Sequence, residues 1–233
     1  MSIEPRVEEK APSTYSPDTK ERLLDAAIRV FSKKGFQASS MRIITREAGT
    51  SLSAANYHFG SKEELLRAAL RSRADVLNTR RLDLLDQAIE AEGESLSVEA
   101  VLDAFVRPIF ERKAEMKARS QATPGVAMRL YLDPEVAISK IRHEVFESTN
   151  QRFVEVMVSA LPGSTQSSVA EAMGFVVGMV VYTVNQWSEA EEQPGEHEDE
   201  ASRQLERVLG FAAAGVRAFV TGPSDSSSSG RGN

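Results

Sequence analysis

Apolar residues recur with helical spacing along most of the chain. From Leu23 to Phe31 they follow the i, i+4, i+7, i+8 order of one buried helix face. Ser16 and Pro17 lie just upstream and are typical of a helix start, since proline is tolerated in the first turn. Gly35 follows the last apolar position, where a glycine commonly ends a helix. The pattern predicts a first helix that ends at Gly35.

A second block predicts two short helices joined by a glycine turn. The first is expected from about Met41 to Ala48, and the second from Leu52 to about Phe59. Gly49 stands between them and supplies the positive φ that a tight turn between helices requires. This arrangement is typical of a helix-turn-helix, although an ordinary helical hairpin would show the same pattern.

The rest of the chain also predicts helices. Ser61 and Glu64 have the spacing of a capping box and open a longer helix. Turn-forming Gly and Pro residues then divide the chain, and Pro108 is expected to kink one helix. The sequence shows no alternating strand pattern and no internal repeat. It predicts an all-α fold with further helices at about 61–91, 95–119, 125–132, 134–160, 164–190 and 198–220.

Composition divides the chain into two domains and two tails. Residues 1–17 are rich in Pro, Glu and Ser, and residues 222–233 in Gly and Ser. Because neither segment has helical periodicity, both predict disordered tails. Between them we expect a small helix-turn-helix domain at 18–66 and a larger helical domain at 67–221.

Composition also excludes several classes of protein. Without cysteine the chain forms no disulfide and no thiolate metal site, which fits a reducing compartment. The N-terminus lacks the apolar run of a signal peptide. The most apolar stretch, Ala172 to Val184, falls short of the roughly 20 residues of a membrane span, so it predicts a buried helix. We expect a cytoplasmic protein without a membrane partner.

Charge is distributed unevenly along the chain. The formal net charge is −6, yet residues 18–81 hold 13 Lys and Arg against 7 Asp and Glu. Residues 82–233 hold 13 against 24. A basic N-terminal segment on an acidic body favours an anionic partner for that segment, such as DNA.

The second short helix presents side chains suited to base edges. Asn56 can pair bidentately with adenine, and Ala54 or Leu52 can pack on a thymine methyl. Because Ala55 and Phe59 are expected to face inward, the expected outward positions are Leu52, Ser53, Ala54, Asn56 and Tyr57.

Phosphate contacts are expected beside these base contacts. Tyr57 and His58 can reach phosphates from the end of the second short helix. Lys62 stands in the first turn of the next helix, beside free backbone N–H groups, and is also placed for a phosphate.

The stretch from Ser39 to Leu66, SSMRIITREAGTSLSAANYHFGSKEELL, resembles the DNA-binding signature of the TetR family of bacterial repressors. The preceding helix, RLLDAAIRVFSKKGF, also resembles this family, so the similarity covers about residues 19–67. Two positions depart from it: Thr50 replaces a small aliphatic residue, and Leu52 replaces a common polar one. The resemblance implies that the second short helix is the recognition helix. The positions that match the family's usual DNA contacts are Ser40, Arg42, Ser51, Ser53, Ala54, Asn56, Tyr57, His58 and Lys62.

The resemblance further implies a C-terminal domain that forms homodimers. The helix at 164–190 is apolar on more than one side, and small residues four apart permit close helix contact. With the last helix it is expected to form a four-helix interface, although both could be core helices of a monomer. The candidate interface residues are Gly174, Gly178, Val181, Leu205, Leu209 and Val216.

A ligand pocket in the same domain is also implied by the resemblance. Large side chains between the helices could line it, although an aromatic residue at helical spacing is more often part of a core. The candidate pocket residues are Phe105, Met128, Tyr131, Phe146, Thr149, Phe175 and Tyr182.

No catalytic residue, metal ligand set or cofactor motif is predicted. The three histidines are scattered, and the sequence contains no P-loop, G-x-G-x-x-G or G-x-S-x-G. The sequence therefore predicts a ligand-responsive DNA-binding regulator. We expect a repressor that binds a palindromic double-stranded operator as a dimer and is released by a small, largely apolar effector. The alternative is a helical enzyme or small-molecule carrier with a vestigial DNA-binding motif.

Overall fold

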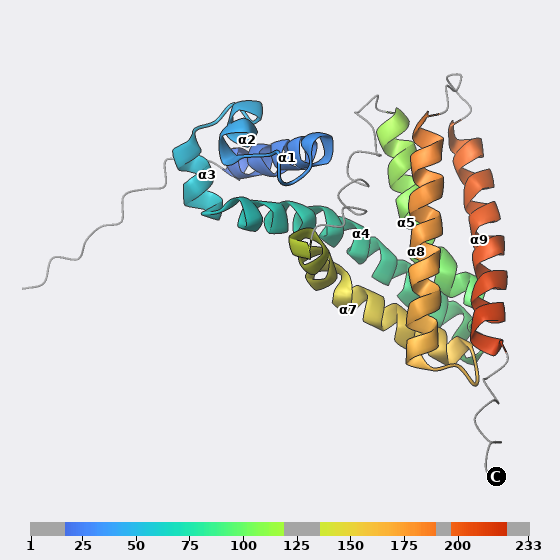
Figure 1. Cartoon of the computed structure of the whole chain (residues 1–233). Coiled ribbons are helices and arrows are strands. Elements are labelled where there is room, and N and C mark those ends of the chain that lie inside the picture. Colours follow the sequence, from blue (N-terminus) through green and yellow to red (C-terminus); the bar gives the residue numbers. More distant parts are fainter. Residues whose placement is uncertain (1–16, 119–135, 190–196, 223–233) are drawn as a thin grey trace, which may run out of the picture. The chain divides into compact units, whose positions relative to one another are not determined.

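The computed structural model describes residues 17–118, 136–189 and 197–222, and every regular element that these residues form is a helix (Figure 1). The predicted all-α fold is therefore confirmed. The chain divides into two compact units, residues 1–69 and residues 70–233, called here the N-terminal unit and the C-terminal unit. The predicted helix at 125–132 and all but one residue of each predicted tail lie outside the described residues.

Three helices and the first turns of a fourth form the N-terminal unit. They are α1 (Pro17–Lys34), α2 (Met41–Glu47), α3 (Leu52–Phe59) and the start of α4 (Lys62–Glu92). Helices as short as α2 and α3 are marginal by themselves, so packing must hold them. α1 contacts both of them. The largest fully buried side chains of this unit are Leu23, Phe31, Ile44, Leu65 and Leu66.

Polar caps begin several helices close to the predicted positions. The Oγ of Ser61 accepts from the N–H of Glu64 at 3.1 Å, as the capping box requires. The second hydrogen bond of the predicted capping box, from the N–H of Ser61 to the Glu64 carboxylate, is not formed. The N–H of Ser61 instead donates to the Phe59 carbonyl at 2.8 Å, and the Glu64 carboxylate pairs with Arg67. The tight turn before α4 supplies a closer acceptor than the glutamate does.

The C-terminal unit contains the rest of α4, a 3-10 turn (Gly93–Ser95) and the described helices α5 (Val98–Ala118), α7 (Val136–Ala160), α8 (Gln166–Glu189) and α9 (His197–Thr221). α5 contacts α7, α8 and α9, and Figure 1 shows α5, α8 and α9 side by side. In the core, the rings of Phe105 and Phe153 meet edge to face, with centroids 5.0 Å apart.

One ion pair joins the start of α5 to the end of α9. Both terminal nitrogens of Arg217 donate to the Glu99 carboxylate at 2.5 Å. This hydrogen bonding lowers the pKa of Glu99 below its usual value, although partial desolvation opposes the shift. Because the pair joins opposite ends of the two helices, α5 and α9 are antiparallel.

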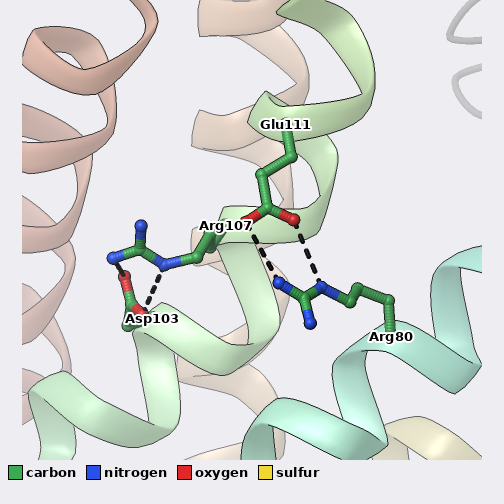
Figure 2. Close-up of polar contacts among 4 residues, drawn as sticks. All are labelled: Arg80, Asp103, Arg107 and Glu111. Atoms are coloured by element: carbon green, nitrogen blue, oxygen red, sulfur yellow. Dashed lines mark hydrogen bonds and ion pairs between the residues drawn. The ribbon is translucent and has the colours of Figure 1, made fainter. Parts of the chain in front are cut away.

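Two further ion pairs involve α5, as Figure 2 shows. Arg80 of α4 donates to Glu111 at 3.3 and 3.4 Å, which links the two helices. Arg107 donates twice to Asp103, one turn earlier, at 2.8 Å, and this raises the pKa of Arg107. All four side chains are substantially exposed, so the pairs contribute little to the free energy of unfolding.

The apolar helix of the sequence analysis is α8. It begins earlier than the stretch considered there, so that Gln166–Val184 is long and apolar enough by composition to cross a membrane. The same helix packs into the core through one side, with Val169, Val176 and Val180 buried. Burial of this side is what a core helix shows, as the sequence predicted.

Packing around Phe153 predicts the effect of a core substitution. Phe153→Ala should lower the free energy of unfolding by about 3–5 kcal/mol, because it empties a fully buried site beside Phe105. Val76→Ala, at a position of α4 that is 62% exposed, should change it by less than about 0.5 kcal/mol. Urea unfolding of both variants measures the difference, and equal losses would contradict the packing.

Candidate functional site

The turn between α2 and α3 is fixed by backbone geometry and by one distant side chain. Gly49 has φ +60°, and the N–H of Thr50 donates to the Thr45 carbonyl at 2.9 Å. Arg22 of α1 donates to the carbonyls of Ala48 and Gly49, at 2.6 and 2.5 Å. The positive φ would strain any other residue at Gly49, and its Cβ would lie 3.1 Å from the Arg22 guanidinium, which would have to shift slightly. The predicted glycine turn is confirmed.

Two of the predicted DNA contacts also cap the short helices. The Oγ of Ser40 accepts from the N–H of Ile43 at 3.3 Å, and the Oγ of Ser51 accepts from the N–H of Ala54 at 3.1 Å. Both serines are exposed. A capping hydroxyl uses its oxygen as an acceptor and keeps its O–H as a donor, so each can still donate to a phosphate.

α3 presents a polar, exposed face. Ser53 and Asn56 are exposed, and Tyr57 is 63% exposed. Arg42 is exposed on α2, and Leu52 is partly exposed at the start of α3. An amide, a hydroxyl and a phenol on one short helix can meet base edges and phosphates in a major groove.

Ala54 does not belong to this face. It is fully buried, like its neighbour Ala55, so the expectation that its methyl packs on a thymine is wrong. Both α1 and α2 contact α3, which makes the buried side of this helix wider than one stripe. The small side chain at Ala54 therefore serves close helix packing within the unit.

The half-buried side chain of Lys62 makes its hydrogen bonds within the N-terminal unit. Its ammonium donates to the carbonyls of Phe36 and Ser39, at 2.9 and 3.1 Å, and lies 4.1 Å from the centre of the Phe36 ring. These contacts tie the start of α4 to the loop between α1 and α2. The expected phosphate contact thus competes with a structural role that sequence spacing does not reveal.

His58 is partly buried between two aromatic neighbours. Its ring centre lies 5.3 Å from that of Tyr57 and 6.0 Å from that of Phe59. The Nε2 atom is enclosed within the unit. A phosphate could therefore approach this ring only at Nδ1.

The candidate pocket residues of the C-terminal unit separate into three groups. Phe105 and Thr149 are buried, and Phe146 is half-buried. Phe175 and Tyr182 are 60% and 65% exposed, so their assignment to an interior pocket is wrong. α8 is apolar on two sides, and these two residues lie on the outer one. Met128 and Tyr131 lie outside the described residues.

Three buried polar side chains of the C-terminal unit were not found by sequence reasoning: Asn78 and Arg81 of α4 and Lys113 of α5, all less than 9% exposed. Arg81 donates to the Phe105 carbonyl at 2.8 Å, with its guanidinium 3.9 Å over the Phe105 ring, and Lys113 donates to the Val184 carbonyl. α4 is rich in charged residues, so no periodicity distinguishes its buried ones.

The outer side of α8 and α9 carries an apolar groove. Phe175 and Phe219 meet edge to face at 5.4 Å, and Phe211 beside them is 73% exposed. The predicted interface residues Gly174 and Gly178 are exposed, and a Cβ on either would meet nothing within 4 Å. Leu209 is half-buried. The groove is lined by Ala172, Phe175, Val176, Met179, Phe211, Ala212, Gly215, Val216 and Phe219.

Three other interface candidates pack within the chain. Val181 and Leu205 are 4% and 6% exposed, so their side chains already belong to the core of one subunit. Val216 is also buried but lines the floor of the groove. Separately, no cluster of three or more His, Asp or Glu that could hold a metal ion occurs in the described part of the chain.

Two family models match this chain. Residues 23–69 match the model described as bacterial regulatory proteins, tetR family, and residues 103–215 match the tetracyclin repressor-like C-terminal domain. The first match covers the helix-turn-helix, and the second covers much of the C-terminal unit.

Curated relatives agree with these matches. HTH-type transcriptional regulator SrpR of Pseudomonas putida is 36% identical over 100 residues, which is 42% of this chain and 45% of SrpR. The uncharacterised HTH-type regulator TtgW, also of Pseudomonas putida, is 36% identical over 100 residues, or 42% of this chain and 72% of TtgW. The HTH-type transcriptional repressor AcnR of Corynebacterium glutamicum is 23% identical over 70% of this chain and 93% of its own. The matched stretch thus spans less than half of SrpR.

A solved structure shares the fold. A transcriptional regulator from Pseudomonas aeruginosa PAO1 superposes with a TM-score of 0.59 at 18% identity, covering 91% of this chain and all of that one.

The contacts of Lys62 predict a loss of stability on its substitution. Lys62→Met should lower the free energy of unfolding of the N-terminal unit by about 1–3 kcal/mol, because two carbonyls lose a charged donor. The matched control is Lys20→Met, on the exposed side of α1. Chemical unfolding followed by circular dichroism measures both, and equal stability of the two variants would contradict the structural role.

Proposed function

The chain belongs to the TetR family of bacterial regulatory proteins, and we propose that it is a transcriptional repressor that a small molecule releases from DNA. A homodimer in the cytoplasm binds an inverted-repeat operator through α3 of each subunit. The protein acts by binding and not by catalysis. The name of the relative AcnR supports repression over activation.

One observation carries this proposal: the exposed polar face of α3. Ser53, Asn56 and Tyr57 are exposed on a helix whose other side is fully packed. The turn before α3 is held by Arg22, and the loop before α2 by Lys62. A rigidly held helix with exposed polar side chains is what base readout in a major groove requires.

The apolar groove on α8 and α9 supports a dimer. Three large apolar side chains, Phe175, Phe211 and Phe219, are between 42% and 73% exposed there. Contiguous exposed apolar surface of this kind marks an interaction site, and a second copy would cover it with the same surface. A two-fold dimer also supplies two recognition helices, which must lie about 34–36 Å apart to read successive major grooves.

Release would follow from a shift between two conformations. An effector that binds the C-terminal unit better in one conformation shifts the population toward it. If the two α3 helices then no longer match the grooves, operator affinity falls by the coupling free energy, typically about 1–3 kcal/mol. α4 has residues in both units and is the element that would transmit the change.

Selection of bound genomic DNA fragments tests the proposal. Recovery of one inverted-repeat motif by the purified protein is the expected result. If no sequence is enriched over competitor DNA, the proposal is wrong. The chain would then be better described as a helical enzyme or small-molecule carrier with a vestigial DNA-binding motif.

Asn56 is expected to confer sequence specificity. Asn56→Ala should weaken binding to the selected operator by about 1–3 kcal/mol and change binding to random DNA little, because a bidentate base contact is lost. Titrations of wild type and variant with both DNAs measure this. Equal losses on the two DNAs would show that Asn56 does not read a base.

Gly178 is expected to lie where two subunits meet. Gly178→Leu should leave the single chain folded, because a Cβ there meets nothing within 4 Å. In a dimer the leucine would overpack the interface, at a cost of about 1–3 kcal/mol, and would raise the dissociation constant. The control is Gln151→Leu, on the exposed side of α7.

Sedimentation velocity and thermal melts of these variants show whether Gly178 lies at a subunit interface or packs within one chain. Earlier dissociation of the Gly178→Leu dimer, with operator binding that becomes concentration-dependent, supports the interface. A wild-type protein that sediments as a monomer at micromolar concentration would contradict it.

A further inference from the structure

Arg22 of α1 makes its hydrogen bonds with the backbone at the end of α2. Its Nε donates to the Ala48 carbonyl at 3.1 Å, and its Nη2 donates to the Ala48 and Gly49 carbonyls at 2.6 and 2.5 Å. Its Nη1 lies 3.7 Å from a carboxylate oxygen of Asp18, one turn earlier on α1. Each of the three guanidinium nitrogens therefore already has a partner in the N-terminal unit. To bind a DNA phosphate, Arg22 would have to give up one of these contacts.

The two carbonyls lie where the chain passes from α2 to α3. The Thr45 carbonyl, further back in α2, accepts from the N–H of Thr50 at 2.9 Å. The carbonyls of Ala48 and Gly49 come after the end of α2, and two residues separate Gly49 from the start of α3. A cation at this end of a helix is also favoured by the helix dipole. Arg22 thus fixes the backbone directly before α3.

Side-chain packing alone locates the first turns of α3 weakly. The buried side chains there are those of Ala54 and Ala55, and a methyl group forms only a low ridge between packed helices. The larger buried side chain, that of Phe59, lies at the other end of α3. The position of the start of α3 therefore depends on the turn before it, and this turn depends on Arg22.

Base readout requires a more exact position of α3 than phosphate binding does. A hydrogen bond weakens steeply when its angle falls or its length leaves about 2.7–3.2 Å. A bidentate contact from Asn56 to a base must satisfy two such bonds at once. Contacts to phosphates come from several rotatable side chains and carry no sequence information. A small displacement of α3 is therefore expected to weaken operator binding and to leave binding to random DNA nearly unchanged.

We propose that Arg22 is a positioning residue for DNA recognition, which sets the sequence specificity of α3 through the carbonyls of Ala48 and Gly49 without touching DNA. The inference rests on the proposed function, because it concerns how α3 reads an operator. Without the guanidinium, the turn samples further conformations. Operator affinity then falls in proportion to the fraction of molecules that keep the conformation competent for binding.

A charge-matched pair of variants tests this role. Arg22→Gln removes the donor to the turn, and Arg29→Gln removes the same charge two turns later on α1. Arg29 also reaches α2, but through an exposed ion pair with the Glu47 side chain at 3.2 Å. Arg22→Gln should weaken operator binding about tenfold, the effect of one lost charged hydrogen bond, and binding to random DNA less than about twofold. Arg29→Gln should change both affinities less than about twofold.

Titrations of these variants with both DNAs measure the affinities. Equal losses on operator and random DNA in Arg22→Gln, or no loss on either, would overturn the proposal. The same selective loss in Arg29→Gln would also overturn it, because removal of a charge from α1 would then be sufficient.

A pair of lysine variants keeps the charge and decides the question if Arg22→Gln does not fold. The lysine ammonium stands one bond short of the place of Nη2, the nitrogen that reaches the Gly49 carbonyl. Arg22→Lys should therefore lose operator affinity selectively, but less than Arg22→Gln does. Arg29→Lys is the control. Equal operator affinities of the two lysine variants would contradict the proposal.

Two further measurements distinguish positioning from a direct phosphate contact. If Arg22 bound a phosphate, Arg22→Gln would lower the slope of log affinity against log salt by about one unit, whereas we expect no change in the slope. Hydrogen exchange followed by mass spectrometry should be faster over residues 45–56 in Arg22→Gln than in Arg29→Gln, at unchanged helical content by circular dichroism. A lower slope, or a loss of operator affinity without faster exchange there, would overturn the proposal.

Selection of an operator separates this inference from the function on which it rests. If the wild-type protein enriches no inverted repeat, the proposed function fails and the inference fails with it. If wild type binds an operator and Arg22→Gln loses affinity equally on operator and random DNA, the inference alone is wrong.

Discussion

The backbone groups at the ends of very short helices impose the main constraint on the N-terminal unit. α2 and α3 have seven and eight residues, so a large part of their N–H and C=O groups has no partner within the helix. Serine caps satisfy donors at both starts, and Arg22 satisfies carbonyls at the end of α2. Because Ser40, Ser51 and Arg22 satisfy these backbone groups, the exposed side chains of α3 are not needed for this purpose and can contact DNA as proposed.

Local sequence signals predicted the helices and the turn of this unit well. Gly49 and the serine caps act through their own backbone or that of near neighbours, so a short window of sequence contains the whole interaction. The structural role of Lys62 was missed because its carbonyl partners lie 26 and 23 residues away. A lysine in the first turn of a helix looks the same in sequence whether it holds a phosphate or a loop.

In the C-terminal unit, periodicity predicted helices but not which side of each helix faces the core. α8 is apolar nearly all round, so Phe175 and Tyr182 fit a core, a pocket or a subunit interface equally well by spacing. Only packing places them on the outer side. The opposite problem hid Asn78 and Arg81, because α4 is so rich in polar residues that two buried ones do not stand out from the rest.

α4 donates hydrogen bonds to backbone carbonyls from two of its cations, Lys62 and Arg81. Near its start, Lys62 holds the carbonyls of Phe36 and Ser39, and further along Arg81 holds that of Phe105. Each cation therefore ties α4 to a segment at least 23 residues away in the sequence. A hydrogen bond from a charged donor is worth about 1.5–3 kcal/mol. In the proposed mechanism, any movement of α4 would have to keep these hydrogen bonds or exchange them for others of similar strength.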